Sequence, residues 1–219
     1  MKIVRPKQLT DKVVIVDGLP GNGKSLFGMS ILPALERVEL YSYSEVLESL
    51  CALHYLNKLD LDTAATLIQL FTDRKIYEHM MGRKVNFRPT DLSSIFNYPD
   101  PSKYINRLFE KGDKEIPSKI DKQKPILNIQ THNMLAFSKP LWAGLKGKLF
   151  FLEIVRHPAF MFKQIYTSAM GDLINSPRNW TLHVEFGSNI FPFYVANYEN
   201  FFSEANQHEK TVLFIHNYI

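Results

Sequence analysis

Residues 18–25 read Gly-Leu-Pro-Gly-Asn-Gly-Lys-Ser and fit the phosphate-loop pattern G-x-x-x-x-G-K-[S/T]. They follow the apolar run Val-Val-Ile-Val at residues 13–16, which is typical of a buried strand that ends at Asp17. Glycines let the backbone wrap a phosphate with its N–H groups, and a helix beginning near Lys24 directs its positive end to the same point. The sequence therefore predicts a strand, a phosphate-binding loop and a helix in succession.

Short apolar runs recur between helical stretches, a pattern typical of a parallel sheet wrapped by helices. Strands are predicted at residues 12–16, 125–130, 148–155 and 211–216, with residues 38–43 as a candidate fifth. We expect a three-layer α/β/α fold of the P-loop type, with a mainly parallel central sheet of about five strands. Ligands of such sheets bind beyond the carboxyl ends of the strands, so the residues after each strand are the candidates for function.

The length of 219 residues and the 45% hydrophobic content suit one P-loop α/β domain spanning residues 1–219. Residues 45–124 show helical periodicity and are predicted to form a helical insertion, which a polar loop at 111–119 joins back to the sheet. The insertion is either an acceptor-binding or lid region, or a cover for one face of the sheet.

Charge and cysteine content narrow the class of protein. The 26 basic and 22 acidic residues give a net charge of +4, which suits an anionic ligand better than duplex nucleic acid. The single cysteine, Cys51, excludes an internal disulfide and is predicted to be a buried helix residue. Neither a signal-peptide core nor an apolar run of the roughly 20 residues of a membrane span is found. We expect a soluble, cytoplasmic protein with no membrane span and no nucleic-acid partner.

A magnesium site is the first question that the loop raises. In a nucleoside triphosphatase, Lys24 reaches the β and γ phosphates, Ser25 holds magnesium, and an acidic residue at another strand end completes the metal site. Glu153 lies inside its predicted strand, where an ion pair with a lysine is the simpler interpretation, and Asp17 directly precedes the loop. Neither is a convincing magnesium partner, so no metal site is predicted.

Polar residues follow two other predicted strands. Thr131 and His132 come after residues 125–130, and a histidine there suits a general base at neutral pH. The hydroxyls of Thr131 and Ser25 are candidate donors. Arg156 comes after residues 148–155 and precedes a predicted helix at 159–170, a place well suited to a second phosphate group. A structural histidine and an arginine paired with a carboxylate remain the alternatives.

The order of a phosphate loop, Thr-His and Arg-x-Pro resembles the sulfotransferase family, over about residues 12–170. In that family the loop holds the 5′-phosphosulfate of 3′-phosphoadenosine 5′-phosphosulfate (PAPS), the arginine binds its 3′-phosphate, and the histidine often serves as base. The resemblance implies that Arg156 binds the 3′-phosphate and that His132 deprotonates the acceptor. It assigns the sulfate donor to Gly21, Asn22, Gly23, Lys24 and Ser25.

Departures from the family pattern are clear. Family loops commonly read P-K-x-G-T-T, whereas this chain has Gly21 at the lysine position and places Lys24 after Gly23. Gln164 stands where members have a serine that contacts the 3′-phosphate, and it retains a hydrogen-bond donor. Ala159 replaces a second arginine of the family motif. The C-terminal R-K-G segment of cytosolic members is absent, which leaves a truncated chain or a divergent branch as interpretations.

The sequence thus predicts a P-loop group transferase, and the resemblance implies a sulfotransferase that moves a sulfuryl group from PAPS to a hydroxyl or amine. Lys24 and His132 are the expected catalytic residues, and the acceptor is an unidentified small molecule or saccharide. The basic turn at residues 82–89 is a candidate grip for an anionic acceptor. The alternatives are an ATP- and magnesium-dependent small-molecule kinase, and a nucleotide-gated interaction module that uses the aromatic residues at 191–202.

Overall fold

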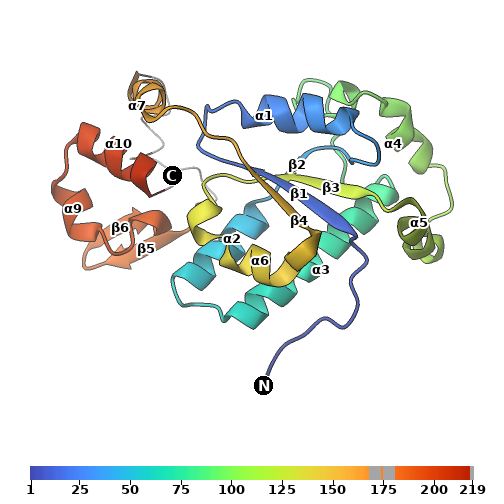
Figure 1. The fold of residues 1–219 in the computed structure, drawn as a ribbon, viewed down its shortest axis with the longest axis horizontal. Coiled ribbons are helices and arrows are strands. Elements are labelled where there is room, and N and C mark those ends of the chain that lie inside the picture. The colour runs from blue at the N-terminus through green and yellow to red at the C-terminus, as the bar shows by residue number, and fades with distance from the viewer. Residues whose placement is uncertain (168–173, 175–180, 218–219) are drawn as a thin grey trace.

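A parallel sheet of four strands lies at the centre of the molecule, in the order β2-β3-β1-β4 (Figure 1). The computed structural model describes residues 1–167, 174 and 181–217. The strands of this sheet are β1 (Lys12–Asp17), β2 (Ser42–Tyr43), β3 (Ile126–Gln130) and β4 (Leu149–Glu153). A separate antiparallel hairpin pairs β5 (His183–Phe186) with β6 (Asn189–Pro192).

Helices cover both faces of the sheet, as the fold class predicted (Figure 1). The first half of the chain contains α1 (Lys24–Leu26), α2 (Glu45–Tyr55), α3 (Leu61–Met80) and α4 (Pro101–Arg107). The second half contains α5 (Ile116–Gln123), α6 (Lys139–Leu145), α7 (Pro158–Thr167), α9 (Glu199–Glu204) and α10 (Gln207–His216). The turns of α1 continue as a π-helical segment, Phe27–Ile31, and a 3-10 turn, Leu32–Ala34. Further 3-10 turns are Ile95–Asn97, Asp113–Glu115, Leu135–Phe137, Lys146–Lys148 and Phe193–Val195.

The apolar side chains of β1 alternate between two hydrophobic cores. Val13 and Ile15 belong to the core that α2, α3 and α6 cover. Val14 and Val16 belong to a smaller core on the opposite face, which Leu32 completes beside α1. A strand buried on both faces has to be apolar at every position, which explains the continuous run in the sequence.

The region at residues 45–124 contains α2 and α3, which agree with the helical periodicity of its sequence. Ser44 begins α2, because its hydroxyl accepts a hydrogen bond from the Leu47 N–H at 3.3 Å. Cys51 lies fully buried within α2, as predicted, and burial raises the pKa of its thiol to about 12. Both α2 and α3 pack on the same side of the sheet as α6, so this part of the insertion covers one face (Figure 1).

One of the predicted strands was wrong. Residues 211–216 form the end of α10 rather than a strand, so the sheet has four strands instead of about five. Asn206 and Glu209 form a capping box that begins this helix, and that local signal outweighs the β-rich composition of the run. The remaining strand of the sheet is β2, Ser42–Tyr43, which forms the last two residues of the candidate at 38–43.

Three further features bear on the sequence predictions. The expected polar loop at 111–119 is wrong in part, because Asp113–Glu115 form a 3-10 turn and α5 begins at Ile116. The aromatic residues at 191–202 belong largely to the core, where Phe191, Phe193, Tyr194 and Phe202 are buried. Within the described ranges, no helix is both long enough and apolar enough to cross a membrane.

Candidate functional site

The loop at residues 18–25 has the backbone that its glycines predict. Gly18, Gly21 and Gly23 have φ angles of 132°, 82° and 99°, which residues with a side chain rarely adopt. At Gly18 a Cβ atom would also lie 2.6 Å from the carbonyl oxygen of Ile154, at the exit of β4. The loop therefore turns sharply at the end of β1 and is held close to the neighbouring strand.

Asn22 and Lys24 hold this loop in a closed form. The Asn22 side chain donates to the carbonyl oxygen of Ile154, and its Oδ1 accepts a hydrogen bond from the Lys24 N–H at 3.1 Å. Lys24 Nζ donates to the carbonyl oxygen of Leu19 at 3.0 Å, and only 3% of the residue is exposed. An anion that binds in the loop has to take the place of these internal acceptors.

Asp17 anchors the loop to the segment that follows β3. Its carboxylate accepts hydrogen bonds from the Thr131 hydroxyl at 2.8 Å and from the Met134 and Leu135 N–H groups at 2.6 and 3.1 Å. Thr131 is fully buried in this contact, so the suggestion that its hydroxyl serves a ligand is wrong. Both residues act here as structural links between neighbouring strands.

Glu153 stands beside Asp17 at the carboxyl end of β4, because the strand ends two residues earlier than predicted. Burial and the carboxyl of Asp17 raise the pKa of Glu153 to about 8, against the opposing charge of Lys24. Two adjacent carboxyl groups therefore retain a proton near neutral pH. Within the described part of the chain, no group of three or more His, Cys, Asp or Glu residues is placed to hold a metal ion.

His132 lies in a polar cluster at the end of β3. Its Nδ1 is 3.2 Å from Glu48 Oε1, and its backbone N–H donates to the same oxygen at 2.7 Å. The Tyr43 hydroxyl donates to Glu48 Oε2 at 2.7 Å, and the Tyr43 ring packs edge-on against the imidazole with centroids 5.1 Å apart. Glu48 from α2 thus fixes the imidazole of His132 from one side.

The other ring nitrogen of His132, Nε2, lies 3.4 Å from the side-chain nitrogen of Gln130. An ionised Glu48 carboxylate only accepts hydrogen bonds, so a proton on Nδ1 pairs with it and leaves Nε2 as the nitrogen that takes a further proton. This is the arrangement of a general base whose second nitrogen is oriented by a carboxylate.

Arg156 and Gln164 meet at the end of β4. Arg156 is exposed and donates to Gln164 Oε1 at 2.7 Å, in the second turn of α7. Its guanidinium also lies over the ring of Phe160, 5.6 Å from the centroid. The two residues that the sequence assigns to one phosphate are therefore neighbours in the structure.

The loop, His132 and Arg156 all lie at the carboxyl ends of the strands. The loop follows β1, and the pairings of β1 with β3 and with β4 are both parallel, so their carboxyl ends lie together. His132 follows β3 on one side of the loop, and Arg156 follows β4 on the other side. The sheet therefore places the loop between the candidate base and the candidate phosphate-binding arginine.

Some functional candidates behave differently from the sequence interpretation. Ser25 is half-buried beside Tyr41. Burial raises the pKa of Tyr41 to about 12, although a hydrogen bond from Ser25 acts in the opposite direction. In the basic turn, Arg83 pairs with Asp113 at 3.7 Å and Arg88 pairs with Asp91 at 3.4 Å, so these charges are at least partly neutralised.

Glu48, Tyr43 and Gln130 were missed by sequence reasoning. Glu48 lies 84 residues before His132, and no local pattern connects them. The only signal was a carboxylate in the first turn of a helix that Ser44 begins.

Comparison with known proteins finds no match. No protein-family model matches it, and neither a curated protein nor a solved structure shows significant similarity.

Proposed function

We propose that the protein is a sulfotransferase that moves a sulfuryl group from PAPS to a hydroxyl or amine of a small acceptor. One observation carries the proposal: the phosphate loop, the His132 base and the Arg156–Gln164 pair follow three adjacent parallel strands at one sheet edge. The resemblance of these motifs, in this order, to the sulfotransferase family supports the same assignment.

The residues of the loop are suited to the sulfonate end of the donor. The N–H groups of residues 21–25 and the ammonium of Lys24 would bind the 5′-phosphosulfate once the Leu19 carbonyl is exchanged for it. Arg156 and Gln164 would hold the 3′-phosphate with charge-assisted hydrogen bonds. Lys24 would then stabilise the negative charge that grows on the bridging oxygen during transfer.

His132 supplies the acid–base chemistry. Its Nε2 takes the proton of the acceptor as the acceptor oxygen or nitrogen forms a bond to sulfur. The bond between sulfur and the phosphate oxygen breaks, and adenosine 3′,5′-bisphosphate leaves. Glu48 stabilises the imidazolium that forms, because its carboxylate already accepts the Nδ1 proton.

The closed loop adds a requirement for opening. The cavity between the loop and Arg156 measures about 30 Å³, which is smaller than a nucleotide. Asn22 and Ile154 line this cavity and contact each other across it. Donor binding therefore has to separate Asn22 from the exit of β4.

Thermal shift with purified protein tests the proposal. Adenosine 3′,5′-bisphosphate should raise the melting temperature without magnesium, because a ligand that binds the native state stabilises it by mass action. ATP with magnesium serves as the comparison. Magnesium-dependent stabilisation by ATP, with no response to the bisphosphate, would overturn the sulfotransferase assignment.

A small-molecule kinase is the second candidate, and the Asp17–Glu153 pair is the observation that favours it. Two carboxyl groups beside Lys24 at adjacent strand ends are in the region where P-loop enzymes hold magnesium. Against this function, the carboxylate of Asp17 already accepts three hydrogen bonds from the protein. A Lys24→Ala variant that loses magnesium-dependent ATP binding would support the kinase.

A further inference from the structure

A cavity of about 560 Å³ opens beside Ser25 at the β2 edge of the sheet. Side chains of the α1 region, β2, α3 and residues 84–93 form its walls, among them Ser25, Tyr41, Ser42, Tyr43, Lys75 and His79. Sites for small molecules commonly measure roughly 300–1,000 Å³, so the cavity has room for one sugar ring or two. The lining combines hydroxyl and amino groups with apolar side chains and with the Asp91 carboxylate, which pairs with Arg88 at 3.4 Å.

Lys75 brings a positive charge to this cavity from α3. Burial lowers the pKa of its ammonium group. The carboxylates of Glu78 and Glu45 act in the opposite direction but do not cancel this effect. Glu78 is already engaged, since its Oε1 pairs with Arg74 at 3.0 Å and with Lys84 at 2.7 Å. Glu45 and Glu78 act on Lys75 through their charge without forming an ion pair with it, so an anion inside the cavity would add a direct counter-charge.

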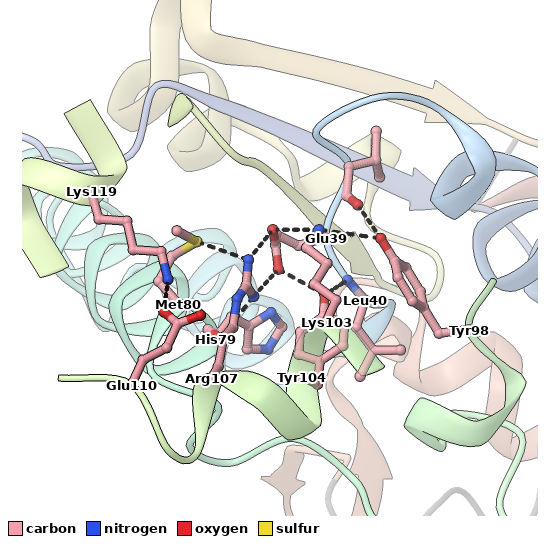
Figure 2. Close-up of polar contacts among 11 residues, drawn as sticks. Glu39, Leu40, His79, Met80, Tyr98, Lys103, Tyr104, Arg107, Glu110 and Lys119 are labelled. Atoms are coloured by element: carbon pink, nitrogen blue, oxygen red, sulfur yellow. Dashed lines mark hydrogen bonds and ion pairs between the residues drawn. The ribbon is translucent and has the colours of Figure 1, made fainter. Parts of the chain in front are cut away.

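His79 presents a second polar group to the same space. The residue is 1% exposed, and its Nδ1 has no hydrogen-bond partner among the described residues. Burial, together with the charge of Lys75, lowers the pKa of the imidazole to about 3, so the ring is neutral. Figure 2 shows the ring beside Arg107, which donates to the His79 carbonyl oxygen at 3.0 Å. A buried ring nitrogen without a partner indicates a place for a ligand or a water molecule.

The cavity lies next to the candidate base in the row of groups at the strand ends. Along the sheet, Arg156 follows β4, the loop follows β1, His132 follows β3, and Tyr43 of β2 lines the cavity. The Tyr43 ring also contacts the imidazole of His132. The cavity thus lies on the side of the base that faces away from Arg156.

We propose that this cavity binds the acceptor of the transfer reaction, and that the acceptor is a small hydroxyl-bearing acid whose anionic group pairs with Lys75. This inference rests on the proposed function, because only a group transferase requires an acceptor. The hydroxyls of Ser42 and Tyr43 donate to the Asn128 carbonyl and to Glu48, so their oxygens act as hydrogen-bond acceptors for the remainder of the acceptor molecule.

Titration calorimetry at constant ionic strength tests the inference with glucuronic acid, glucose 6-phosphate and neutral glucose as probes. The wild-type chain should bind at least one of the two acids tenfold or more tightly than glucose. Lys75→Met should lose at least tenfold of that affinity, because the methionine keeps most of the length without the charge. Lys58→Met is the matched control, since Lys58 is exposed in the turn between α2 and α3.

Adenosine 3′,5′-bisphosphate is titrated into the same three proteins. Equal binding of the bisphosphate to all three, with loss of acid binding only in Lys75→Met, supports the inference. Bisphosphate binding with no preference for the acids, or with unchanged acid affinity in Lys75→Met, overturns the acidic acceptor and leaves the proposed function standing. Lys75-dependent acid binding without bisphosphate binding overturns the acceptor role and the sulfotransferase together.

Discussion

Two groups of buried charges differ in how completely they are paired. The Glu39 cluster, defined as Glu39, Lys103, Tyr104 and Arg107, joins α4 to the chain before β2 (Figure 2). Arg107 donates to both carboxylate oxygens of Glu39, at 2.7 and 3.0 Å. The second group, at the carboxyl end of the sheet, consists of Asp17, Lys24 and Glu153. Here the carboxyl of Glu153 lies beside that of Asp17, and Lys24 is the nearby cation.

The pKa values of the two carboxyl groups reflect this difference in pairing. Burial alone would raise the pKa of Glu39, but the bonds and charge of Arg107 lower it to about 2. The pKa of Glu153 is raised to about 8 by burial and by Asp17. A fully paired cluster is typical of a structural link, whereas groups with shifted protonation at a strand end are typical of a functional site. The comparison predicts loss of stability from changes at Glu39 and loss of function from changes at the sheet edge.

His132→Asn should have the largest effect on the proposed reaction. Removal of a general base costs roughly 10²–10⁴-fold in rate, and the melting temperature should change much less, because the asparagine amide can replace the Nδ1 hydrogen bond to Glu48. Steady-state kinetics with PAPS and an acceptor, followed by release of the bisphosphate, measure the effect.

Glu48→Gln separates the positioning role from the base. It keeps a hydrogen-bond acceptor near Nδ1 but removes the charge, so we expect roughly a tenfold loss in rate and a shifted pH profile. A His132→Asn variant as active as the wild type would remove His132 from the mechanism.

Glu39→Ala should be the most destabilising change, at about 3–5 kcal/mol, because it leaves Arg107 buried without its counter-charge. Urea denaturation followed by circular dichroism measures the free energy of unfolding. The double variant Glu39→Leu/Arg107→Met should recover much of the loss, since it removes both charges together. A single variant as stable as the wild type would show that the Glu39 cluster is not a structural link.

The same comparison shows what the sequence could and could not predict. The sharp turn at residues 18–25 and β1 were predictable because each is a local pattern, and the strand places the turn at the carboxyl end of the sheet. Pairs such as Glu39 with Arg107, 68 residues apart, and Glu48 with His132, 84 apart, depend on how helices pack on the sheet. No local sequence pattern predicts which of these distant residues come into contact.

The prediction of a strand at residues 211–216 was wrong for a different reason. Its run of Thr, Val, Leu, Phe and Ile suits a strand by composition, because a short apolar run has no clear period. The capping box of Asn206 and Glu209 was present in the sequence and was the better signal.

Arg156→Met should weaken binding of adenosine 3′,5′-bisphosphate by roughly 10- to 100-fold, the equivalent of about 1.5–3 kcal/mol for a charged hydrogen bond. Stability should be unaffected, because Arg156 is exposed. Lys163→Met on α7 is the matched control, since it removes an exposed charge near the same site. Equal losses in both variants, measured by calorimetry, would mean that the effect is one of general charge rather than of Arg156.

Glu153→Gln should change how stability depends on pH. The folded state raises the pKa of Glu153 from 4.5 to about 8, so it favours the protonated form. The contribution of Glu153 to stability is therefore full below about pH 4.5 and is lost as the pH rises toward 8.

Glu39 has the opposite sign. Its pKa is lowered from 4.5 to about 2, so its contribution is present above pH 4.5 and is lost as the pH falls toward 2. Melting temperatures between pH 4.5 and 8 should therefore decline less in Glu153→Gln than in the wild type, while both lose stability alike in acid. Parallel curves for the two proteins across this range would show that Glu153 and Asp17 do not share a proton, and the contrast between the two charge clusters would then fail.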